Sequence, residues 1–196
     1  MLIQSHAKFA LYFLDGIQRN MNIQLNKQSF VLGNIEPDFP FVFPTVKHYK
    51  QSNHDFIYSL IKDLYEYNCN GNFLSLAKLS EKLGIINHYI CDYFCRPHFD
   101  RDYYSSHLVE HLGYEKDLHR YLNTSYSFSD NEDAYSKTLP LEGIFPFIEE
   151  RLFEYDNREM GFQTDIDFAL STVSAINSTI LSNLVFENYV LSLSTL

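Results

Sequence analysis

Apolar side chains recur at helical spacing along most of the chain, and this periodicity constrains the fold more than any other feature. In the first segment Phe9, Tyr12, Phe13 and Ile17 share one side of a helix, and Ser5 is the expected N-cap. Further helices are predicted at about residues 53–68, from the Asn-Gly turn at 70–71 to Cys95, and at 105–123, 140–155 and 164–193. No convincing alternating strand pattern is visible, so the sequence predicts an all-α fold.

Several residues set the expected ends of these helices. Asn53 and either Ser105 or Ser106 are the predicted caps, Pro140 is the predicted start of another helix, and Gly84 is a possible interruption. Two stretches are predicted to be non-helical. Residues 31–50 contain Gly33, Pro37, Pro40 and Pro44 but also many Phe and Val residues, so a loop that packs on the core is expected. The polar, acidic stretch 124–138 is the best candidate for a mobile loop.

Composition limits the class of protein. The 196 residues are 45% apolar with only 7 glycines and 6 prolines, which favours one globular domain over residues 1–196 with a sizeable core. The formal net charge of −10 argues against stable binding to nucleic acid. No signal peptide and no apolar run of roughly 20 residues is seen, so a cytoplasmic protein without a transmembrane segment is expected.

The three cysteines, Cys69, Cys91 and Cys95, form no C-x-x-C pair and no disulfide framework. Burial as small apolar side chains is therefore the expected role of these cysteines.

Two histidine–carboxylate pairs carry the strongest chemical signal. His88 with Asp92 and His111 with Glu115 are each four residues apart, so each pair projects from one face of a helix. Imidazole nitrogen and carboxylate oxygen are both ligands for zinc. One such pair is weak evidence, since surface helices often form it as an ion pair. Two pairs on either side of His98, which follows a helix-stopping proline, favour a metal site.

Other polar residues extend or compete with this set. Asp38 lies between two prolines in an apolar loop, where it is either an exposed turn residue or a buried group that needs a partner. His54 competes with His48 as a loop-side ligand, and His54-Asp55 invites comparison with HD-domain phosphohydrolases. His107 is a competing or supporting residue for the second pair. His119 is expected to face solvent or to hydrogen-bond Glu115.

The ordered motifs are SHAKFAL, GNIEPDF, KHYK, HYICDYFCRPH and HLGYEKDLH, over residues 6 to 115. In this order they resemble the zinc-dependent phospholipase C family, whose all-α fold also serves the S1/P1-type nucleases. The resemblance implies a single-domain helical bundle with a metal cluster in a cleft. The site residues that it implies are His6, Asp38, His48, His88, Asp92, His98, His111 and Glu115.

The resemblance also implies how these residues are shared among ions. One zinc takes Asp38, His48, His88 and Asp92, a second takes His98, His111 and Glu115, and a third takes His6 with Asp92. The third zinc of the family also binds the amino group and carbonyl of an N-terminal tryptophan, which this chain lacks. Either Met1 or a neighbouring residue replaces it, or the third site is weak or absent. Two or three zinc ions are therefore expected.

The implied activity is hydrolysis of a phosphoester by water that the metal activates, and the family name suggests a phospholipid as the substrate. Asp38 is the candidate general base, and Phe39, Phe41 and Phe43 either line the substrate cleft or pack as loop residues. One alternative is an S1/P1-like nuclease or a phosphatase acting on soluble phosphoesters, for which Lys47, Lys50 and Arg96 are the nearby basic residues. Another is a non-catalytic, zinc-stabilised helical binding protein.

Overall fold

The all-α prediction is confirmed by the computed structural model, which describes residues 1–39, 41–42, 46–69, 74–100, 106–128 and 132–184. Within these ranges there are helices and no strands. The elements are α1 (Ile3–Met21), α2 (Lys27–Ile35), η1 (Glu36–Asp38), α3 (Lys50–Cys69), α4 (Leu76–Tyr93), α5 (Arg96–Phe99), α7 (Leu108–Thr124), α8 (Glu132–Tyr135), η2 (Leu141–Gly143), α9 (Ile144–Asp156) and α10 (Phe162–Leu184).

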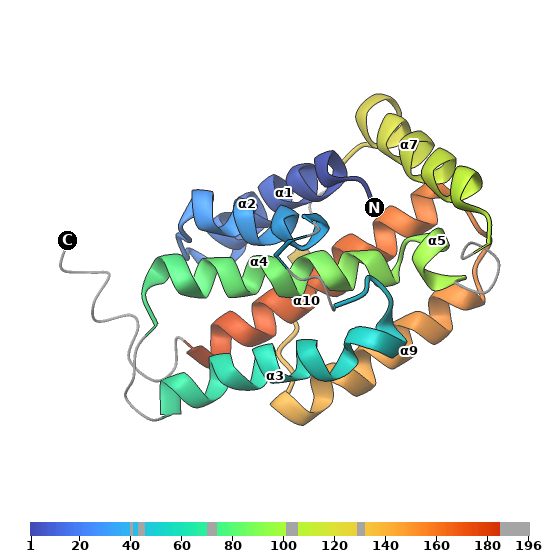
Figure 1. Ribbon diagram of the computed structural model, residues 1–196. Helices are drawn as coiled ribbons and strands as arrows, with labels where there is room; N and C mark the ends of the chain where they lie inside the picture. The colour runs from blue at the N-terminus through green and yellow to red at the C-terminus, as the bar shows by residue number, and fades with distance from the viewer. Residues whose placement is uncertain (40, 43–45, 70–73, 101–105, 129–131, 185–196) are drawn as a thin grey trace.

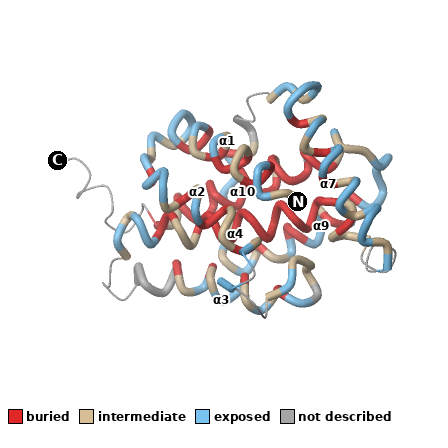
Figure 2. Tube along the Cα trace, turned by 45° about the horizontal axis from the view of Figure 1, so that its top comes forward, coloured by how far each residue is buried: buried red, intermediate tan, exposed pale blue. Residues whose placement is uncertain are grey.

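Helices α4 and α10 cross the middle of the bundle, with α1 and α2 on one side and α3 and α9 on the other (Figure 1). Both central helices are buried over most of their length (Figure 2). In α4 every residue from Leu83 to Tyr93 is buried, including His88 and Asp92. The predicted metal pair therefore lies in the core, where unpaired polar groups are costly.

Two glycines expected to break helices lie inside them instead. Gly33 is within α2 and Gly84 is within α4, at the point where these two helices cross. A Cβ atom on Gly33 would collide with the carbonyl oxygen of Glu81, and one on Gly84 with that of Phe30. These glycines are present because the two backbones approach closely, and the predicted interruption at Gly84 is wrong.

The first two predicted helix starts are wrong because the polar residues taken as caps contact residues of other helices instead. Helix α1 begins at Ile3 with Leu2 as its N-cap, and α3 begins at Lys50. Ser5 and Asn53 lie inside these helices, and their side chains contact distant residues. Ser5 Oγ lies 3.0 Å from His119 Nδ1, and Asn53 accepts a hydrogen bond from the Tyr93 hydroxyl.

The later helices also begin beyond the expected residues. His107, rather than Ser105 or Ser106, is the N-cap of α7. Pro140 precedes η2, and α9 begins at Ile144. The described part of the last helix ends at Leu184, so its predicted extension to Leu193 lies outside the described residues.

Both stretches predicted to be loops contain helical residues among those that the structure describes. Residues 31–35 continue α2, and η1 follows directly. In the acidic stretch 124–138, α8 places Tyr135 in the core, where its hydroxyl donates to the Phe13 carbonyl. Phe41 is 93% exposed, so this part of the first stretch does not pack on the core. Pro40, Pro44 and Phe43 lie outside the described residues.

None of the described helices combines the length and apolar character needed to cross a bilayer.

Candidate metal centre

The predicted site residues converge from five separate parts of the chain. They come from α1 (His6), η1 (Asp38), the segment before α3 (His48), the α4–α5 region (His88, Asp92, His98) and α7 (His111, Glu115). Five of the eight line a cleft of about 530 Å³, namely Asp38, His48, His98, His111 and Glu115. The other three lie beneath it and are fully buried.

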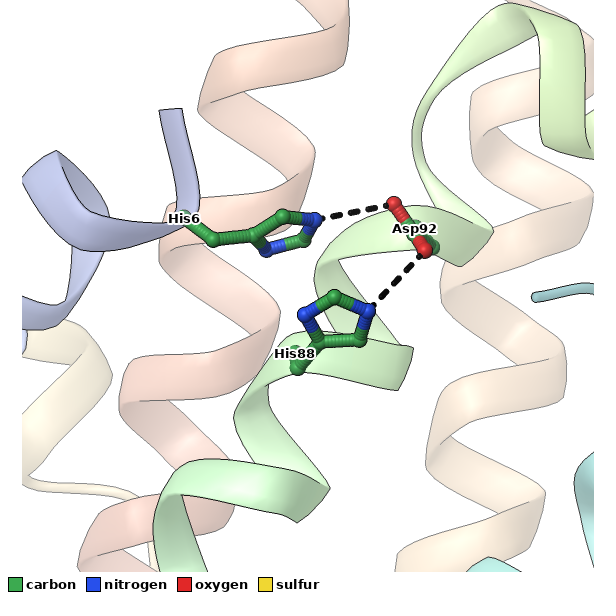
Figure 3. A group of neighbouring side chains, drawn as sticks. All are labelled: His6, His88 and Asp92. Carbon is green, nitrogen blue, oxygen red and sulfur yellow. Dashed lines mark ion pairs between the residues drawn. The ribbon is translucent and has the colours of Figure 1, made fainter. Parts of the chain in front are cut away.

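Asp92 lies at the centre of this group. Its Oδ1 is 3.2 Å from His6 Nε2 and 3.7 Å from His98 Nε2, and its Oδ2 is 2.8 Å from His48 Nδ1 and 3.5 Å from His88 Nε2. Figure 3 shows His6 and His88 approaching opposite oxygens of this carboxylate, one from α1 and one from α4. One buried carboxylate therefore faces four imidazole rings.

Backbone carbonyls set the orientation of three of these rings. His88 Nδ1 donates to the Asn34 carbonyl (2.8 Å), His48 Nε2 to the Pro37 carbonyl (3.2 Å), and His98 Nδ1 to the His48 carbonyl (2.9 Å). In each ring the other nitrogen faces the interior of the site. When such a ring is neutral it has one N–H, so its inner nitrogen carries a lone pair. Fixing the outer nitrogen in this way is typical of histidines that bind metals.

The inner nitrogens form an environment that suits a cation. His88 Nε2 and His48 Nδ1 are 3.0 Å apart, and His48 Nδ1 is also 2.8 Å from Asp92 Oδ2. Burial alone would lower the pKa of His48, but its hydrogen bond with Asp92 and the charge of Asp92 raise it. Asp38 Oδ1 lies 3.8 Å from His88 Nε2 and 3.7 Å from His48 Nδ1. Burial, and then the neighbouring His6, hold the pKa of His88 well below its usual value, which keeps the ring neutral. A divalent ion bound by these groups would replace the proton that Asp92 favours on His48.

Unsatisfied buried atoms support the same conclusion. Within the described residues, His6 Nδ1 and Asp38 Oδ2 have no hydrogen-bond partner, and His6 Nε2 makes only the 3.2 Å ion-pair contact with Asp92. Buried polar atoms usually have such partners, and exceptions at a cluster of this composition point to a ligand. Nitrogen and carboxylate oxygen donors suit zinc.

A second group lies around Glu115 at the other end of the cleft. Its Oε1 is 2.9 Å from His98 Nε2 and 3.0 Å from His111 Nε2. Burial alone would raise the pKa of Glu115, but the amino terminus and the neighbouring ring nitrogens of His111 and His98 hold it far below its usual value. The thiol of Cys95 belongs to this group, since ligand atoms of Cys95, His98 and Glu115 all lie within 4.8 Å of one another.

The α-amino group of Met1 lies between the two groups. It donates to Asp92 Oδ1 at 2.5 Å, and it is 3.0 Å from His98 Nε2 and 3.2 Å from Glu115 Oε1. Burial alone would lower the pKa of this amine, but Asp92, Cys95 and Glu115 together raise it well above its usual value. The position is therefore one at which the structure stabilises a positive charge.

The family model for zinc-dependent phospholipase C matches residues 2–162. The chain belongs to the zinc-dependent phospholipase C family. The match extends past residue 115, where the recognised motifs end, as far as the start of α10. No curated protein and no solved structure matches the chain. Membership of this family supports a metal-dependent phosphoester hydrolase.

Three further histidines have other partners: His54 and His107, which competed for a place among the predicted ligands, and His119, which was expected to face solvent or to hydrogen-bond Glu115. His54 Nδ1 pairs with the adjacent Asp55 at 3.2 Å, and His107 Nδ1 lies 3.0 Å from Ser106 Oγ. One interpretation of the sequence required a hydrogen bond from His119 to Glu115, and the structure does not have it. The two ring nitrogens of His119 instead contact Ser5 Oγ and Asn123 Nδ2, each at 3.0 Å.

Sequence reasoning missed Asp165, which lies outside the matched residues 2–162 and hydrogen-bonds residues close to the second group. Its Oδ2 accepts from the Arg96 N–H (3.1 Å) and the Tyr114 hydroxyl (2.9 Å), and its Oδ1 accepts from the Tyr155 hydroxyl (2.6 Å). Arg96 is two residues before His98, and Tyr114 precedes Glu115. An acidic residue in the first turn of a helix is too common to have indicated this role.

Asp165 also predicts a dependence of stability on pH. Burial raises its pKa from 3.8 to about 6, despite the donors Tyr155, Arg96 and Tyr114. Between these two pH values the folded chain binds a proton that the unfolded chain has lost, so this carboxyl makes the fold less stable as pH rises. Relative to an Asp165→Asn variant, the free energy of unfolding of the wild type is expected to fall by about 2 kcal/mol between pH 4 and 7.

Urea denaturation of the two zinc-free proteins across this pH range measures the difference. Asp167→Asn is the matched control, because Asp167 is an exposed residue of the same helix that accepts a hydrogen bond from Tyr126. A constant difference between wild type and Asp165→Asn over the whole range would contradict the prediction.

Proposed function

We propose that this protein hydrolyses phosphoester bonds with zinc ions held in the cleft. The observation that carries the proposal is the inward orientation of His48, His88 and His98 around Asp92, each fixed by a backbone carbonyl. Family membership supports the same class of reaction. A purely structural role for these rings would not explain why their inner nitrogens gather around carboxylates in a buried group.

The proposed ligand sets follow the geometry of the two groups. One ion is held by Asp38, His48, His88 and Asp92, and a second by His98, His111 and Glu115. His6 and Asp92 form a third set, in which the Met1 α-amine takes the place of the tryptophan amine of the family. The short contact of this amine with Asp92 and its burial support that assignment.

Zinc bound in these sets would lower the pKa of a water molecule and stabilise charge that develops on the phosphoryl oxygens. Asp38 is the proposed general base. Its Oδ1 faces the histidine nitrogens and its Oδ2 has no partner among the described residues, so one oxygen is left to accept a proton. The water oxygen then bonds to phosphorus as the bond to the leaving alkoxide breaks, and the alkoxide takes a proton from solvent, which yields a phosphate product and an alcohol.

Hydrolysis of a lipid or of a soluble phosphoester is favoured over a nuclease activity. Lys47 lines the cleft and is exposed, so it is positioned to contact a phosphate. Lys50 pairs with Glu149, and Arg96 pairs with Asp100 at 3.3 Å. Two of the three nearby basic residues are thus neutralised, whereas tracking a nucleic-acid backbone requires several free cations.

Metal analysis and phosphoester hydrolysis of the same sample test the proposal. Untagged protein purified without chelator is expected to contain two or three zinc ions per chain and to cleave a chromogenic phosphodiester or a short-chain phosphatidylcholine. A content of two zinc ions per chain, rather than three, would show that His6, Asp92 and the Met1 amine do not hold a third ion. Less than one ion per chain after incubation with zinc would contradict the proposal as a whole.

A pair of histidine variants sharpens this test. His48→Asn is expected to lose at least one zinc ion and about 10²-fold or more in kcat/KM, because the amide cannot replace an inward imidazole nitrogen. His54→Asn is the matched control, since His54 lies outside the site and pairs with Asp55. Equal zinc content and activity in the two variants would show that His48 is not a ligand. Plasma emission spectrometry and initial-rate kinetics measure both quantities.

A further inference from the structure

Cys95 lies at a helix N-cap position, but its thiol does not cap the helix. It is the residue before α5, the N-cap position, where Ser, Thr, Asp or Asn usually accepts a hydrogen bond from the first turn of the helix. The side chain of Cys95 makes no such hydrogen bond. Capping therefore does not account for this residue.

The backbone holds Cys95 rigidly between two proposed ligands. Its N–H donates to the Asp92 carbonyl at 3.0 Å, and its own carbonyl accepts from the His98 N–H at 2.9 Å. The side chain is fully buried. Its sulfur lies within 4.8 Å of ligand atoms of both His98 and Glu115. The thiol is thus placed with the nitrogen and oxygen donors of the second group.

We propose that Cys95 Sγ is a ligand of the second metal ion, together with His98, His111 and Glu115. This inference rests on the proposed function, because it adds a donor to a site that the function requires. On binding, the thiol loses its proton to solvent and a bond forms from sulfur to the metal, with no change of oxidation state. Thiolate is a preferred ligand of zinc.

A sulfur ligand would change the role of the second ion. With four protein ligands this site resembles the closed coordination of structural zinc. The position open to water would then lie at the ion held by Asp38, His48, His88 and Asp92. That arrangement agrees with Asp38 as the general base, because the unpartnered Asp38 Oδ2 would lie beside this ion and not beside the second one.

Cobalt substitution tests the sulfur ligand directly. Protein loaded with Co²⁺ is expected to show a near-ultraviolet thiolate-to-cobalt charge-transfer band in the wild type and in Cys91→Ala, and to lose it in Cys95→Ala. Cys91 is the matched control, because it is also a buried cysteine, one turn earlier in the same region, and lies outside the ligand group. X-ray absorption of the wild-type zinc protein should show one sulfur at about 2.3 Å from zinc.

The outcomes separate this inference from the proposed function. Cobalt bound at two or more ions per chain without the band, or with the band unchanged in Cys95→Ala, would overturn the sulfur ligand and leave the hydrolase proposal standing. Cobalt below one ion per chain in the wild type would overturn both. If Cys95→Ala does not fold, X-ray absorption of the wild type still decides, since an absent sulfur shell refutes the inference.

Discussion

An Asp92→Asn variant is expected to bind at least one zinc ion fewer per chain and to lose about 10³-fold or more of its phosphoester hydrolysis. Both oxygens of Asp92 face imidazole nitrogens, and Oδ1 also faces the Met1 amine. The asparagine amide has one neutral oxygen and places an NH₂ group against the other nitrogens. A metal contributes several kcal/mol to stabilising the transition state, and each 1.4 kcal/mol is about tenfold in rate.

Metal content and kcat/KM of the purified variant measure the effect, with circular dichroism to confirm that the chain is folded. This check is needed because removing one partner from a buried set of charges costs about 3–5 kcal/mol of stability. Asp117→Asn is the control, since Asp117 is a half-exposed residue of α7 that pairs with Arg120 at 2.8 Å. A folded Asp92→Asn protein with full zinc content and wild-type kinetics would refute the central role of this carboxylate.

A Gly33→Ala variant is expected to lower the free energy of unfolding by about 1–3 kcal/mol. Helix propensity alone would favour alanine by about 1 kcal/mol, so the sign of the effect tests the helix crossing. The new methyl group would collide with the Glu81 carbonyl of α4 and lie 3.1 Å from the Ile85 nitrogen. Both obstacles are backbone atoms, which can move only if α2 and α4 separate.

Separation of these helices is also expected to weaken zinc binding. Asn34, next to Gly33, provides the carbonyl that orients His88. Gly113→Ala is the matched control, because a Cβ atom at this position in α7 meets nothing within 4 Å. It should stabilise the protein by up to about 1 kcal/mol. Urea denaturation and zinc titration of both variants test the prediction, which fails if Gly33→Ala is as stable as Gly113→Ala.

Local geometry made part of the structure predictable. The helical period of the apolar residues identified the all-α fold because burial of one face requires that period. The spacing of four in His88–Asp92 and His111–Glu115 places each pair on one helix face wherever the helix lies. These predictions depend only on the pitch of a helix. The family motifs added residues that the structure also brings to the cleft.

Predictions that treated side chains as local were the ones that failed. Ser5 and Asn53 read as helix caps, yet they contact His119 and Tyr93 in other helices. Gly33 and Gly84 read as breaks, yet they allow α2 and α4 to cross. Serine, asparagine and glycine can either end a helix or make contacts with another helix. A single sequence does not show whether another helix will pack against them.

The sequence by itself determined that the chain is helical and that two helices each carry a paired imidazole and carboxylate. Only the tertiary structure decided that His6, Asp38 and His48 meet these pairs, because loops and helix crossings bring them together across long separations in sequence. It also decided that backbone carbonyls orient the rings, that Asp165 supports the second group, and that the Cys95 thiol lies among the donors. These depend on the close packing of helices, which the periodicity of one segment does not encode.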